Sequence, residues 1–430
     1  MKLLLKKGRL LDPEQKIDGI FDLLLVDGKI TEFKPEIGTA ADQIIEAKGL
    51  IVVPGFIDLH VHLREPGFEH KETIITGSRA GARGGFTTLC CMPNTKPVAD
   101  RPEILKLIQE KADQGKAAVK ILPIAAVSKG QQSLELTPMA ELKAAGAVAF
   151  SDDGQPVSNS ALMKEAMVRA AKLGTLVIDH CEEKTLSKNG VINEGRVSKA
   201  LNLAGIPAAA EEIMVARDIL LARDNGLQIH LAHLSSRGSI ELLAWAKAKN
   251  IPVSAEVTPH HLLLTEEQLL SRDPVYKVNP PLRTEEDLQA LRKALKEGLI
   301  EIIATDHAPH SEQEKNLGLE RAPFGINGLE TAVPAILDKL VRTGQLPLER
   351  LVEALSSAPA RILKLENKGK IKIGAEADLT LLNLKATTTF SRETFQSKSL
   401  NTPFLNCQFQ GAVAMTIVSG RVAYPFVENN

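Results

Sequence analysis

The stretch "FIDLHVHLREPG", residues 56–67, places two histidines one residue apart inside an apolar run that ends at a Pro-Gly pair. An apolar run of this length, bounded by turn residues, predicts a β-strand. Because side chains alternate between the two faces of a strand, we expect His60, His62 and Arg64 to share one face. Two neighbouring imidazoles suit a transition metal such as zinc, manganese or iron. A histidine can equally be an ordinary core residue, so the rest of the chain has to decide between these interpretations.

Seven further apolar runs rich in β-branched residues follow, and helical patterns lie between most of them. The eight runs are residues 55–62, 86–93, 119–127, 147–153, 175–182, 227–235, 251–260 and 300–310. Two of the helical patterns are 160–174, with Leu162, Ala166, Ala170 and Leu173 on one face, and 284–298, with Leu288, Leu291 and Leu295 on one stripe. Eight strands alternating with helices predict a (β/α)8 barrel of the TIM type.

The two ends of the chain have a different pattern. Both contain short β-rich runs separated by turn signals, including a hairpin expected at Asp27-Gly28. Neither end could bury a core alone, so we expect one small β-sandwich domain built from both termini. The predicted fold class is α/β, with the β-sandwich at 1–51 and 366–430 and the metal-dependent barrel at 52–365.

Composition restricts the function further. The chain of 430 residues is 44% hydrophobic and 3% aromatic and has a net charge of -1, which argues against a nucleic-acid partner. Its four cysteines form no C-x-x-C pair or disulfide framework, so we expect a reducing compartment. The N-terminus lacks a signal-peptide pattern and no apolar run is long enough to span a bilayer, so we expect a cytoplasmic protein that binds no membrane.

Polar residues gather where the apolar runs end. They are His60, His62, Asn94, Asp152, Asp153, His180, His233, Asp306, His307 and His310. Barrel active sites lie at the C-terminal ends of the strands, so this placement indicates a functional site. Four histidines and two carboxylates can hold one or two divalent ions and suit zinc. A metal-bound water has a pKa of about 7, and a carboxylate beside it can carry a proton, which together allow hydrolysis of an amide-like bond.

Other catalytic motifs are missing from the sequence. It has no G-x-S-x-G elbow, no P-loop and no G-x-G-x-x-G, which argues against a serine hydrolase, an NTPase and a dinucleotide-binding enzyme.

Several motifs carry a resemblance to a known family. They are "DLHVHLREPG", "GGFTTLCCMPNT", "AFSDDG", "DHCEE", "AHLSS", "VNPPLR", "ATDHAPH" and "RAPFGINGLET". Over nearly its whole length the chain resembles the amidohydrolase superfamily and, within it, the bacterial dihydroorotase family related to the multifunctional pyrimidine enzyme. The resemblance implies a zinc-dependent enzyme that interconverts N-carbamoyl-L-aspartate and L-dihydroorotate in pyrimidine (UMP) biosynthesis.

The resemblance also implies a role for each site residue. His60 and His62 would bind the first metal ion, which Asp153 would bridge or complete, and His180 and His233 would hold a second ion. Asp306 would ligate the first ion and serve as the catalytic acid and base. The expected substrate contacts are His62, Arg64, Asn94, Asn279, His310 and the backbone of Phe324 and Gly325.

Two positions have a close competitor. Asp152 competes with Asp153, which we prefer because its distance to the histidine of "DHCEE" matches the family spacing. His230 competes with His233, which we prefer because it is nearer the strand end. Hydantoinases, allantoinases and other dihydroorotases bridge two metals with a carboxylated lysine. The fourth run here ends "FSDDG", so we expect an ordinary aspartate as the bridge.

The remaining histidines and the cysteine beside His180 are not expected to bind metal or substrate directly. His260, His261 and His307 are expected to be structural or to lie behind the ligands, His70 to be exposed, and Cys181 to be a packing residue.

Two rival functions are another cyclic amidohydrolase, of the allantoinase or dihydropyrimidinase kind, and a non-catalytic barrel that supports aspartate transcarbamoylase. We expect a homodimer and consider a complex with aspartate transcarbamoylase.

Overall fold

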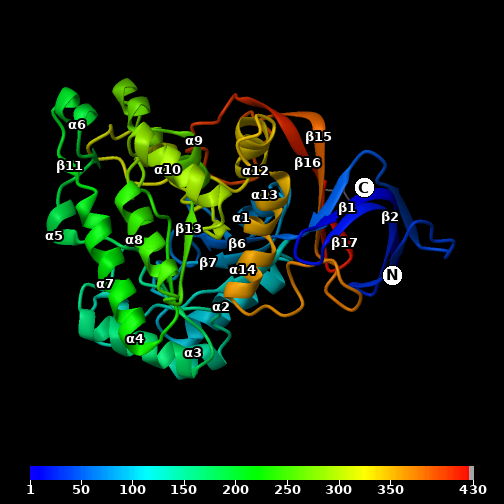
Figure 1. Ribbon diagram of the computed structural model, residues 1–430, viewed down its shortest axis with the longest axis horizontal. Helices are drawn as coiled ribbons and strands as arrows, with labels where there is room; N and C mark the ends of the chain where they lie inside the picture. The colour runs from blue at the N-terminus through cyan, green and yellow to red at the C-terminus, as the bar shows by residue number, and fades with distance from the viewer. Residues whose placement is uncertain (426–430) are drawn as a thin grey trace.

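The structure is a computed structural model in which residues 1–425 are described. A barrel surrounded by helices occupies most of the molecule, and a smaller β domain containing both ends of the chain lies to one side (Figure 1). The predicted fold class, a (β/α)8 barrel with a β-sandwich built from both termini, is confirmed. Within the described residues, none of the helices has the length and apolar character needed to cross a bilayer.

The barrel uses the eight predicted runs in chain order. Seven of them contain regular strands: β6 Phe56–Val61, β7 Phe86–Cys91, β8 Lys120–Pro123, β9 Val177–Asp179, β12 Ile229–Leu231, β13 Val253–Val257 and β14 Ile302–Ile303. The fourth run contributes only Phe150, which makes single parallel bridges to Ala125 and Val177. A parallel bridge between Val61 and His307 closes the barrel from the last run to the first. The strand pairing is parallel throughout.

Helices and short helical turns follow the strands. They are α1 Ile74–Arg83, α2 Pro102–Gln114, α3 Met139–Ala144, α4 Ser160–Lys172, α5 Lys184–Ser187, α6 Arg196–Leu201, α7 Ala209–Asn225, α8 Arg237–Ala248, α9 Pro259–Leu263, α10 Glu285–Lys296, α11 Glu312–Lys315, α12 Ala332–Ile336, α13 Leu348–Leu355 and α14 Ser357–Ile362. The stripe predicted for 284–298 is confirmed, because Leu288, Leu291 and Leu295 of α10 are buried. In α4 the predicted face is confirmed in part: Ala166 and Ala170 are buried together with Met163 and Met167, whereas Leu162 and Leu173 are half-buried.

The terminal strands form one eight-stranded sheet. Its strands are β1 Lys2–Asp12, β2 Ile17–Val26, β3 Lys29–Lys34, β4 Gln43–Glu46, β5 Ile51–Pro54, β15 Leu379–Thr389, β16 Gln408–Val418 and β17 Arg421–Tyr424. β5 pairs with β1 of the N-terminal part and with β15 of the C-terminal part, which joins the two. The predicted hairpin is confirmed: Asp27 and Gly28 connect β2 to β3 with positive φ values of 47° and 80°, as a tight two-residue turn requires.

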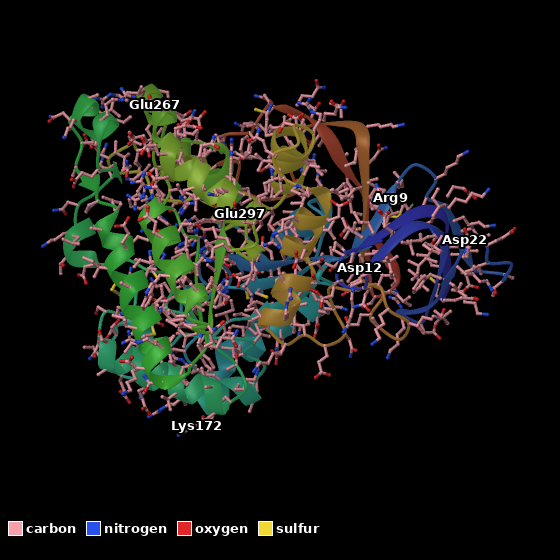
Figure 2. All side chains as sticks on the ribbon, viewed as in Figure 1. Arg9, Asp12, Asp22, Lys172, Glu267 and Glu297 are labelled. Carbon is pink, nitrogen blue, oxygen red and sulfur yellow. The ribbon has the colours of Figure 1, made fainter. Side chains whose placement is uncertain are left out.

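Buried carboxylates also tie the two ends together. Asp12, labelled with Arg9 and Asp22 in Figure 2, accepts the backbone N–H of Ile371 at 2.6 Å. Asp22 accepts the N–H groups of Lys7 and Ile37 at 2.9 and 3.0 Å. A buried carboxylate is tolerated when several N–H donors compensate its lost hydration, so these residues fix the path of the terminal segments.

The predicted boundaries at 51/52 and 365/366 stay predictions. The first falls within β5, and the connection between β15 and β16 leaves the sheet and runs along the barrel (Figure 1). Two short strands outside both sheets, β10 Ile192–Asn193 and β11 Gly205–Ile206, pair with each other beside α5 and α6.

The inside of the barrel is apolar one layer below the polar strand ends. Ile178 precedes His180 by two residues and Ala304 precedes Asp306 by two, and both belong to one buried cluster with Leu59, Cys90 and Met92. The polar residues at the strand ends therefore follow this buried apolar layer within two positions of the chain.

Candidate metal centre and substrate pocket

The six predicted metal ligands converge at the C-terminal ends of the barrel strands. They are His60, His62, Asp153, His180, His233 and Asp306, and each is at most 6% exposed. Five of them line a pocket of about 590 Å³ together with all the predicted substrate contacts, and His60 lies just beneath it. The fold therefore brings together residues that are up to 246 positions apart in the sequence.

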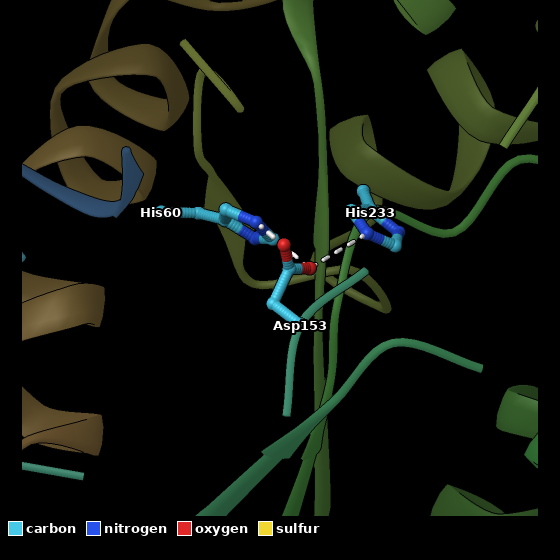
Figure 3. Close-up of side chains that lie close together, drawn as sticks. All are labelled: His60, Asp153 and His233. Carbon is cyan, nitrogen blue, oxygen red and sulfur yellow. Dashed lines mark ion pairs between the residues drawn. The ribbon is translucent and has the colours of Figure 1, made fainter. Parts of the chain in front are cut away.

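Asp153 lies between the histidines. Its Oδ1 is 3.2 Å from His60 Nε2 and 3.5 Å from both His233 Nε2 and His180 Nδ1, as Figure 3 shows for the first two. Its Oδ2 is 3.4 Å from His62 Nε2. One carboxylate oxygen thus faces three imidazoles and the other oxygen faces the fourth, which is the placement that a bridging carboxylate needs.

Two overlapping groups of ligand atoms are compact enough to surround an ion. In one, atoms of His60, His62 and Asp306 all lie within 4.8 Å of one another, and in the other the atoms belong to His60, Asp153 and His233. Asp306 Oδ1 is 2.9 Å from His62 Nε2 and 3.6 Å from His60 Nε2. His180 joins through its Nδ1, which is 2.8 Å from His233 Nε2.

The hydrogen bonding at this cluster fits a divalent ion. His60 Nε2 and Asp153 Oδ1 are buried and lack a hydrogen-bond partner among the described residues, although they lie 3.2 Å apart. Buried polar atoms are nearly always paired, so an unpaired imidazole nitrogen facing an unpaired carboxylate oxygen is a natural pair of metal ligands. Imidazole nitrogens and carboxylate oxygens are also the donors that zinc accepts.

The electrostatics of the cluster favour positive charge. Burial by itself lowers the pKa values of His60 and His180. The carboxylates of Asp153, Glu256 and Glu182 lie beside these rings and raise both pKa values above the usual value. Burial likewise opposes ionisation of Asp153 and Asp306, yet the surrounding imidazoles hold the pKa of each below its usual value. The site therefore stabilises its carboxylates in the ionised form.

Glu256 on β13 holds His60 from behind. Its Oε1 is 2.7 Å from His60 Nδ1, so the ring donates that N–H and presents Nε2 to the cluster. Its Oε2 is 3.1 Å from His230 Nε2, and His230 Nδ1 is 2.8 Å from Ser254 Oγ. Metal-binding histidines commonly have such a carboxylate behind them, because it fixes the tautomer and the ring orientation. His230, the competitor of His233, lies in this supporting network.

Glu182 performs a related task for His180, and the sequence analysis had missed it. Its Oε2 is 3.0 Å from His180 Nε2, accepts the Asn279 Nδ2–H at 3.1 Å, and pairs with Lys184 at 2.6 Å. The sequence feature that could have predicted this role is the position of Glu182, an acid two residues after His180 in "DHCEE". Glu256, also missed, has no local signal, because its partner His60 is 196 residues away.

Asp152 has a structural position, unlike its neighbour. Its Oδ1 accepts the backbone N–H groups of Val127 and Ser128 at 2.8 and 3.1 Å, and its Oδ2 accepts the Ser128 hydroxyl. Every oxygen of this carboxylate is thus occupied by the loop after β8, which leaves Asp153 as the carboxylate that faces the histidines.

Three site residues have left-handed backbone conformations. Arg64, His233 and Asp306 have φ values of 62°, 31° and 46°. Strand alternation was therefore the wrong reason for placing Arg64, because β6 ends at Val61. His233, which was preferred for its closeness to the strand end, lies beyond β12, which ends at Leu231. A non-glycine residue in this region costs about 1–3 kcal/mol, and such strain is concentrated at functional sites.

Arg64 and His310 form the wall opposite the metal ligands. Arg64 Nε donates to Pro309 O at 3.1 Å, and its Nη2 lies 3.2 Å from His310 Nε2. His310 Nε2 lies 2.9 Å from Phe324 O, and its Nδ1 lies 3.3 Å from Lys71 Nζ, so the neutral ring donates to one and accepts from the other. Burial lowers the pKa of Arg64 to about 10, which leaves the guanidinium charged at neutral pH.

Three carboxylates close to Arg64 in the sequence are engaged elsewhere. Glu65 pairs with Lys111, Glu69 accepts the Gly67 N–H, and Asp58 accepts the Thr305 hydroxyl. Asn94 accepts from His62 Nδ1 through its Oδ1 at 2.9 Å, so its amide N–H₂ is directed elsewhere and can serve the pocket.

The predicted ring contacts also line the pocket. Asn279 is held by Glu182, and Phe324 O is held by His310. The Gly325 N–H donates to Lys277 O at 2.9 Å, and its carbonyl accepts from Lys315 and Asn401. The backbone polar groups of Gly325 are therefore already bonded, and the main contribution of this residue to the pocket is that it has no side chain. A Cβ there would lie 2.6 Å from Ala308 O.

The other histidines occupy varied positions. His261 bonds Thr258 and Pro280 O, His307 lies 3.3 Å from Glu72, and His70 is exposed. His260 is buried, and its Nε2 lacks a partner among residues 1–425. Cys181 is buried, as expected for a packing residue.

A barrel with histidines and aspartates around one pocket at its strand ends defines an amidohydrolase, a class of metal-dependent enzymes that includes cyclic amide hydrolases. An L-hydantoinase (dihydropyrimidinase) from Arthrobacter aurescens has a similar structure, with a TM-score of 0.87, 26% identity, and coverage of 98% of this chain and 95% of that one. A family model described as dihydro-orotase-like matches residues 49–239.

Full-length relatives narrow the class to one family. A dihydroorotase from Pelotomaculum thermopropionicum is 50% identical over 423 residues, covering 98% of both chains. A dihydroorotase from Syntrophus aciditrophicus is 46% identical over 426 residues, covering 99% of both. The chain belongs to the dihydroorotase family.

Proposed function

We propose that the chain is a zinc-dependent dihydroorotase that interconverts N-carbamoyl-L-aspartate and L-dihydroorotate in pyrimidine biosynthesis. The observation that carries the proposal is the combination of a six-ligand cluster with the half-buried Arg64 at one pocket. The cluster supplies the chemistry of amide hydrolysis. The guanidinium of Arg64 selects a substrate that carries a carboxylate, because a half-buried cation that faces a pocket is stabilised by an anionic partner.

His60, His62 and Asp306 would hold the first ion, Asp153 would bridge, and His180 and His233 would hold the second. A zinc ion bound there lowers the pKa of a water molecule and polarises the amide carbonyl of the ring. Zinc rather than another metal is proposed from the donor set of imidazoles and carboxylates. Metal analysis of the purified protein gives both the identity of the ion and the number bound per chain.

Asp306 would move the proton. Its carboxylate lies at the pocket surface beside His62, with Oδ1 2.9 Å from Nε2. In the hydrolytic direction it takes a proton from the attacking water and delivers it to the ring nitrogen as the carbon–nitrogen bond breaks. In the direction of ring closure the same carboxylate removes that proton from the carbamoyl nitrogen.

Arg64, Asn94 and His310 would grip the substrate carboxylate. Arg64 brings the charge, Asn94 brings an amide donor while its oxygen remains bonded to His62, and His310 is fixed by Phe324 O and Lys71. Asn279, Phe324 and Gly325 would surround the ring. This arrangement orients the ring amide toward the metal ligands, which is the main way in which positioning accelerates a reaction.

A direct assay tests the proposal. Purified protein should hydrolyse L-dihydroorotate and form it from N-carbamoyl-L-aspartate. Ring closure converts a dianion into a monoanion and consumes one proton, so the equilibrium should shift toward the ring by about tenfold per pH unit as pH falls. Absence of turnover with metal bound, or an equilibrium ratio independent of pH, would contradict the proposed reaction.

A second candidate function is hydrolysis of an uncharged cyclic amide. The structural similarity to the Arthrobacter hydantoinase favours it. Two features of this chain argue against it: Arg64 faces the pocket, and an aspartate occupies the place of a bridging lysine. Turnover of dihydrouracil or hydantoin comparable with that of dihydroorotate would support this alternative.

We further propose a cytoplasmic enzyme that acts as a homodimer, and we retain a complex with aspartate transcarbamoylase as a prediction. The four free cysteines support a reducing compartment. The presence of all six ligands supports a catalytic barrel over a purely supporting one. Light scattering of the purified chain, alone and mixed with aspartate transcarbamoylase, tests both assemblies, and full activity of the chain alone would show that no partner is required.

A further inference from the structure

Residues 396–402, which we name the C-terminal strap, lie outside the barrel in sequence but are packed against the substrate side of its pocket. The strap belongs to the connection between β15 and β16, which runs from the terminal sheet along the barrel (Figure 1). Ser397, Ser399, Asn401 and Thr402 are all at most 6% exposed. A loop so deeply buried and so rich in polar side chains must have its hydrogen bonds satisfied by the barrel.

The side chain of Asn401 makes three hydrogen bonds to two pocket loops. Its Oδ1 accepts the backbone N–H of His310 at 3.0 Å. Its Nδ2 donates to Ala308 O and to Gly325 O, each at 3.0 Å. Ala308, His310 and Gly325 all line the substrate pocket. One amide therefore fixes the spacing between the loop after β14 and the loop that carries Phe324.

One of the two loops so joined carries His310 of the predicted carboxylate grip and anchors Arg64 through Pro309 O. Asn401 holds the backbone on both sides of Pro309, and Pro309 O accepts from Arg64 Nε at 3.1 Å. His310 reaches across to Phe324 O at 2.9 Å. A shift of the 308–310 backbone would thus move the Arg64 anchor and His310 together.

The loop that carries Phe324 is also held by Lys315 of α11. Lys315 is 6% exposed, and its Nζ donates to Pro323 O at 3.0 Å and to Gly325 O at 3.1 Å. The Gly325 carbonyl therefore accepts from both Lys315 and Asn401, which uses both of its lone pairs. The contact is close because Gly325, with φ of 148°, lacks a Cβ that would collide with Ala308 O.

We infer that Asn401 is a positioning residue for substrate binding: through the backbone of Ala308, His310 and Gly325 it sets Arg64 and His310 for the substrate carboxylate. The inference rests on the proposed function and adds a residue from the C-terminal segment to the site. Asn401 acts on the substrate wall alone, because its side-chain bonds go to that wall and not to the metal ligands.

The test compares Asn401→Asp with Asn327→Ala. Aspartate retains the acceptor for the His310 N–H but replaces the donor to Ala308 O and Gly325 O by an oxygen. Asn327 provides the matched control, because its Nδ2 also makes two bonds to the strap, to Ser397 Oγ and Ser399 O, but none to the two pocket loops. For both variants kcat, KM, metal content and thermal stability are measured on the purified enzyme.

Asn401→Asp should raise KM for dihydroorotate by about tenfold to a hundredfold, with kcat changed by less than about threefold and metal content unchanged. Asn327→Ala should lower the melting temperature and leave KM within about twofold. Loss of folded protein alone lowers kcat at constant KM, so the split between the two parameters separates positioning from a merely structural role.

Either of two results would overturn the inference: a fall in kcat at constant KM for the Asn401 variant, or an equal rise in KM for the Asn327 variant. If Asn401→Asp does not fold, Asn401→Ala, which removes the same bonds without burying a charge, is judged by the same outcomes. Failure of the proposed function is recognised separately, since the unmodified protein would then not turn over dihydroorotate at all.

Discussion

The two walls of the pocket are built in different ways. The metal wall consists of side chains at the ends of neighbouring barrel strands, and the Glu256 carboxylate of β13 supports it from behind. The substrate wall consists of the loops 308–310 and 323–325, joined by Asn401 from the strap and by Lys315. The barrel strands thus determine the geometry of the metal wall, whereas contacts between loops that are distant in sequence determine the geometry of the substrate wall.

This difference separates two properties of the site. Strand ends are fixed by the parallel ladder, so the ligands can meet with little freedom and hold an ion. Loops can change without altering the barrel, so the substrate wall is where a charged cyclic amide is distinguished from an uncharged one. Changes to the metal wall should remove catalysis altogether, and changes to the substrate wall should alter affinity and selectivity.

The largest effect is expected when the first metal pair is removed. Replacing His60 and His62 together by alanine should abolish tight metal binding and turnover, because both nitrogens belong to the same compact ligand group. Elemental analysis of the purified variant measures this directly. His70→Ala, an exposed histidine on the same loop, is the control and should retain metal and activity. Undiminished metal in the double variant would show that these histidines are not ligands.

Changing Asp306 tests the proton transfer at the same wall. Asp306→Asn should lower kcat by about 10²–10⁴-fold, the usual range for loss of a general acid or base. Metal content must be measured alongside, because the same residue is a proposed ligand. Asp152→Asn provides a comparison, since that carboxylate caps the loop at Val127 and Ser128 and should affect stability more than turnover. Near-normal turnover with the metal retained would exclude Asp306 as the proton carrier.

Removing the charge from the substrate wall should have a smaller and selective effect. Arg64→Met should lower kcat/KM for dihydroorotate by about tenfold to two-hundredfold, because a hydrogen bond to a charged group contributes about 1.5–3 kcal/mol. Residual turnover of dihydrouracil, which has no carboxylate, should change little. Arg79→Met on the exposed face of α1 serves as the control. Parallel losses on both substrates would indicate that Arg64 has a structural role only.

The smallest effect is expected behind the metal wall. Glu256→Gln preserves the shape of the side chain but weakens its hold on His60 Nδ1, so metal affinity should fall by about 10–100-fold. Competition with a chelator measures the change. With saturating metal, KM for dihydroorotate should remain unchanged, because Glu256 contacts the metal wall from behind and does not contact the carboxylate grip. A raised KM at full metal occupancy would show that the two walls are coupled.

The sequence was most informative where function depends on strand ends. The eight apolar runs predicted the barrel, and the polar residues at the ends of six of these runs predicted the site, because parallel strands end at the same edge. Asp153 and His233 were separated from Asp152 and His230 by family spacing and by closeness to the strand end, and the structure places both preferred residues at the cluster. Leu162 shows the limit of periodicity, since the buried face of α4 consists of Met163, Ala166, Met167 and Ala170 and leaves Leu162 half-buried.

Local pattern could not reveal residues whose partners are remote. Glu256 lies in an apolar strand 196 residues from His60, and Asn401 lies in a segment assigned to the terminal domain, 91 residues from His310. The orientation of Arg64 was inferred from strand alternation, yet its φ of 62° shows that the strand has already ended. Left-handed backbone at such residues is imposed by surrounding contacts, which a short window of sequence does not contain.

The sequence by itself thus determined the barrel, its strand ends and the types of ligand, because hydrophobic periodicity and residue chemistry are local properties. Only the tertiary structure decided which atoms face one another: that Asp153 lies among four imidazoles, that Glu256 supports His60, and that Asn401 joins two pocket loops. These arrangements depend on burial and hydrogen bonding between distant segments, and such contacts exist only once the chain has folded.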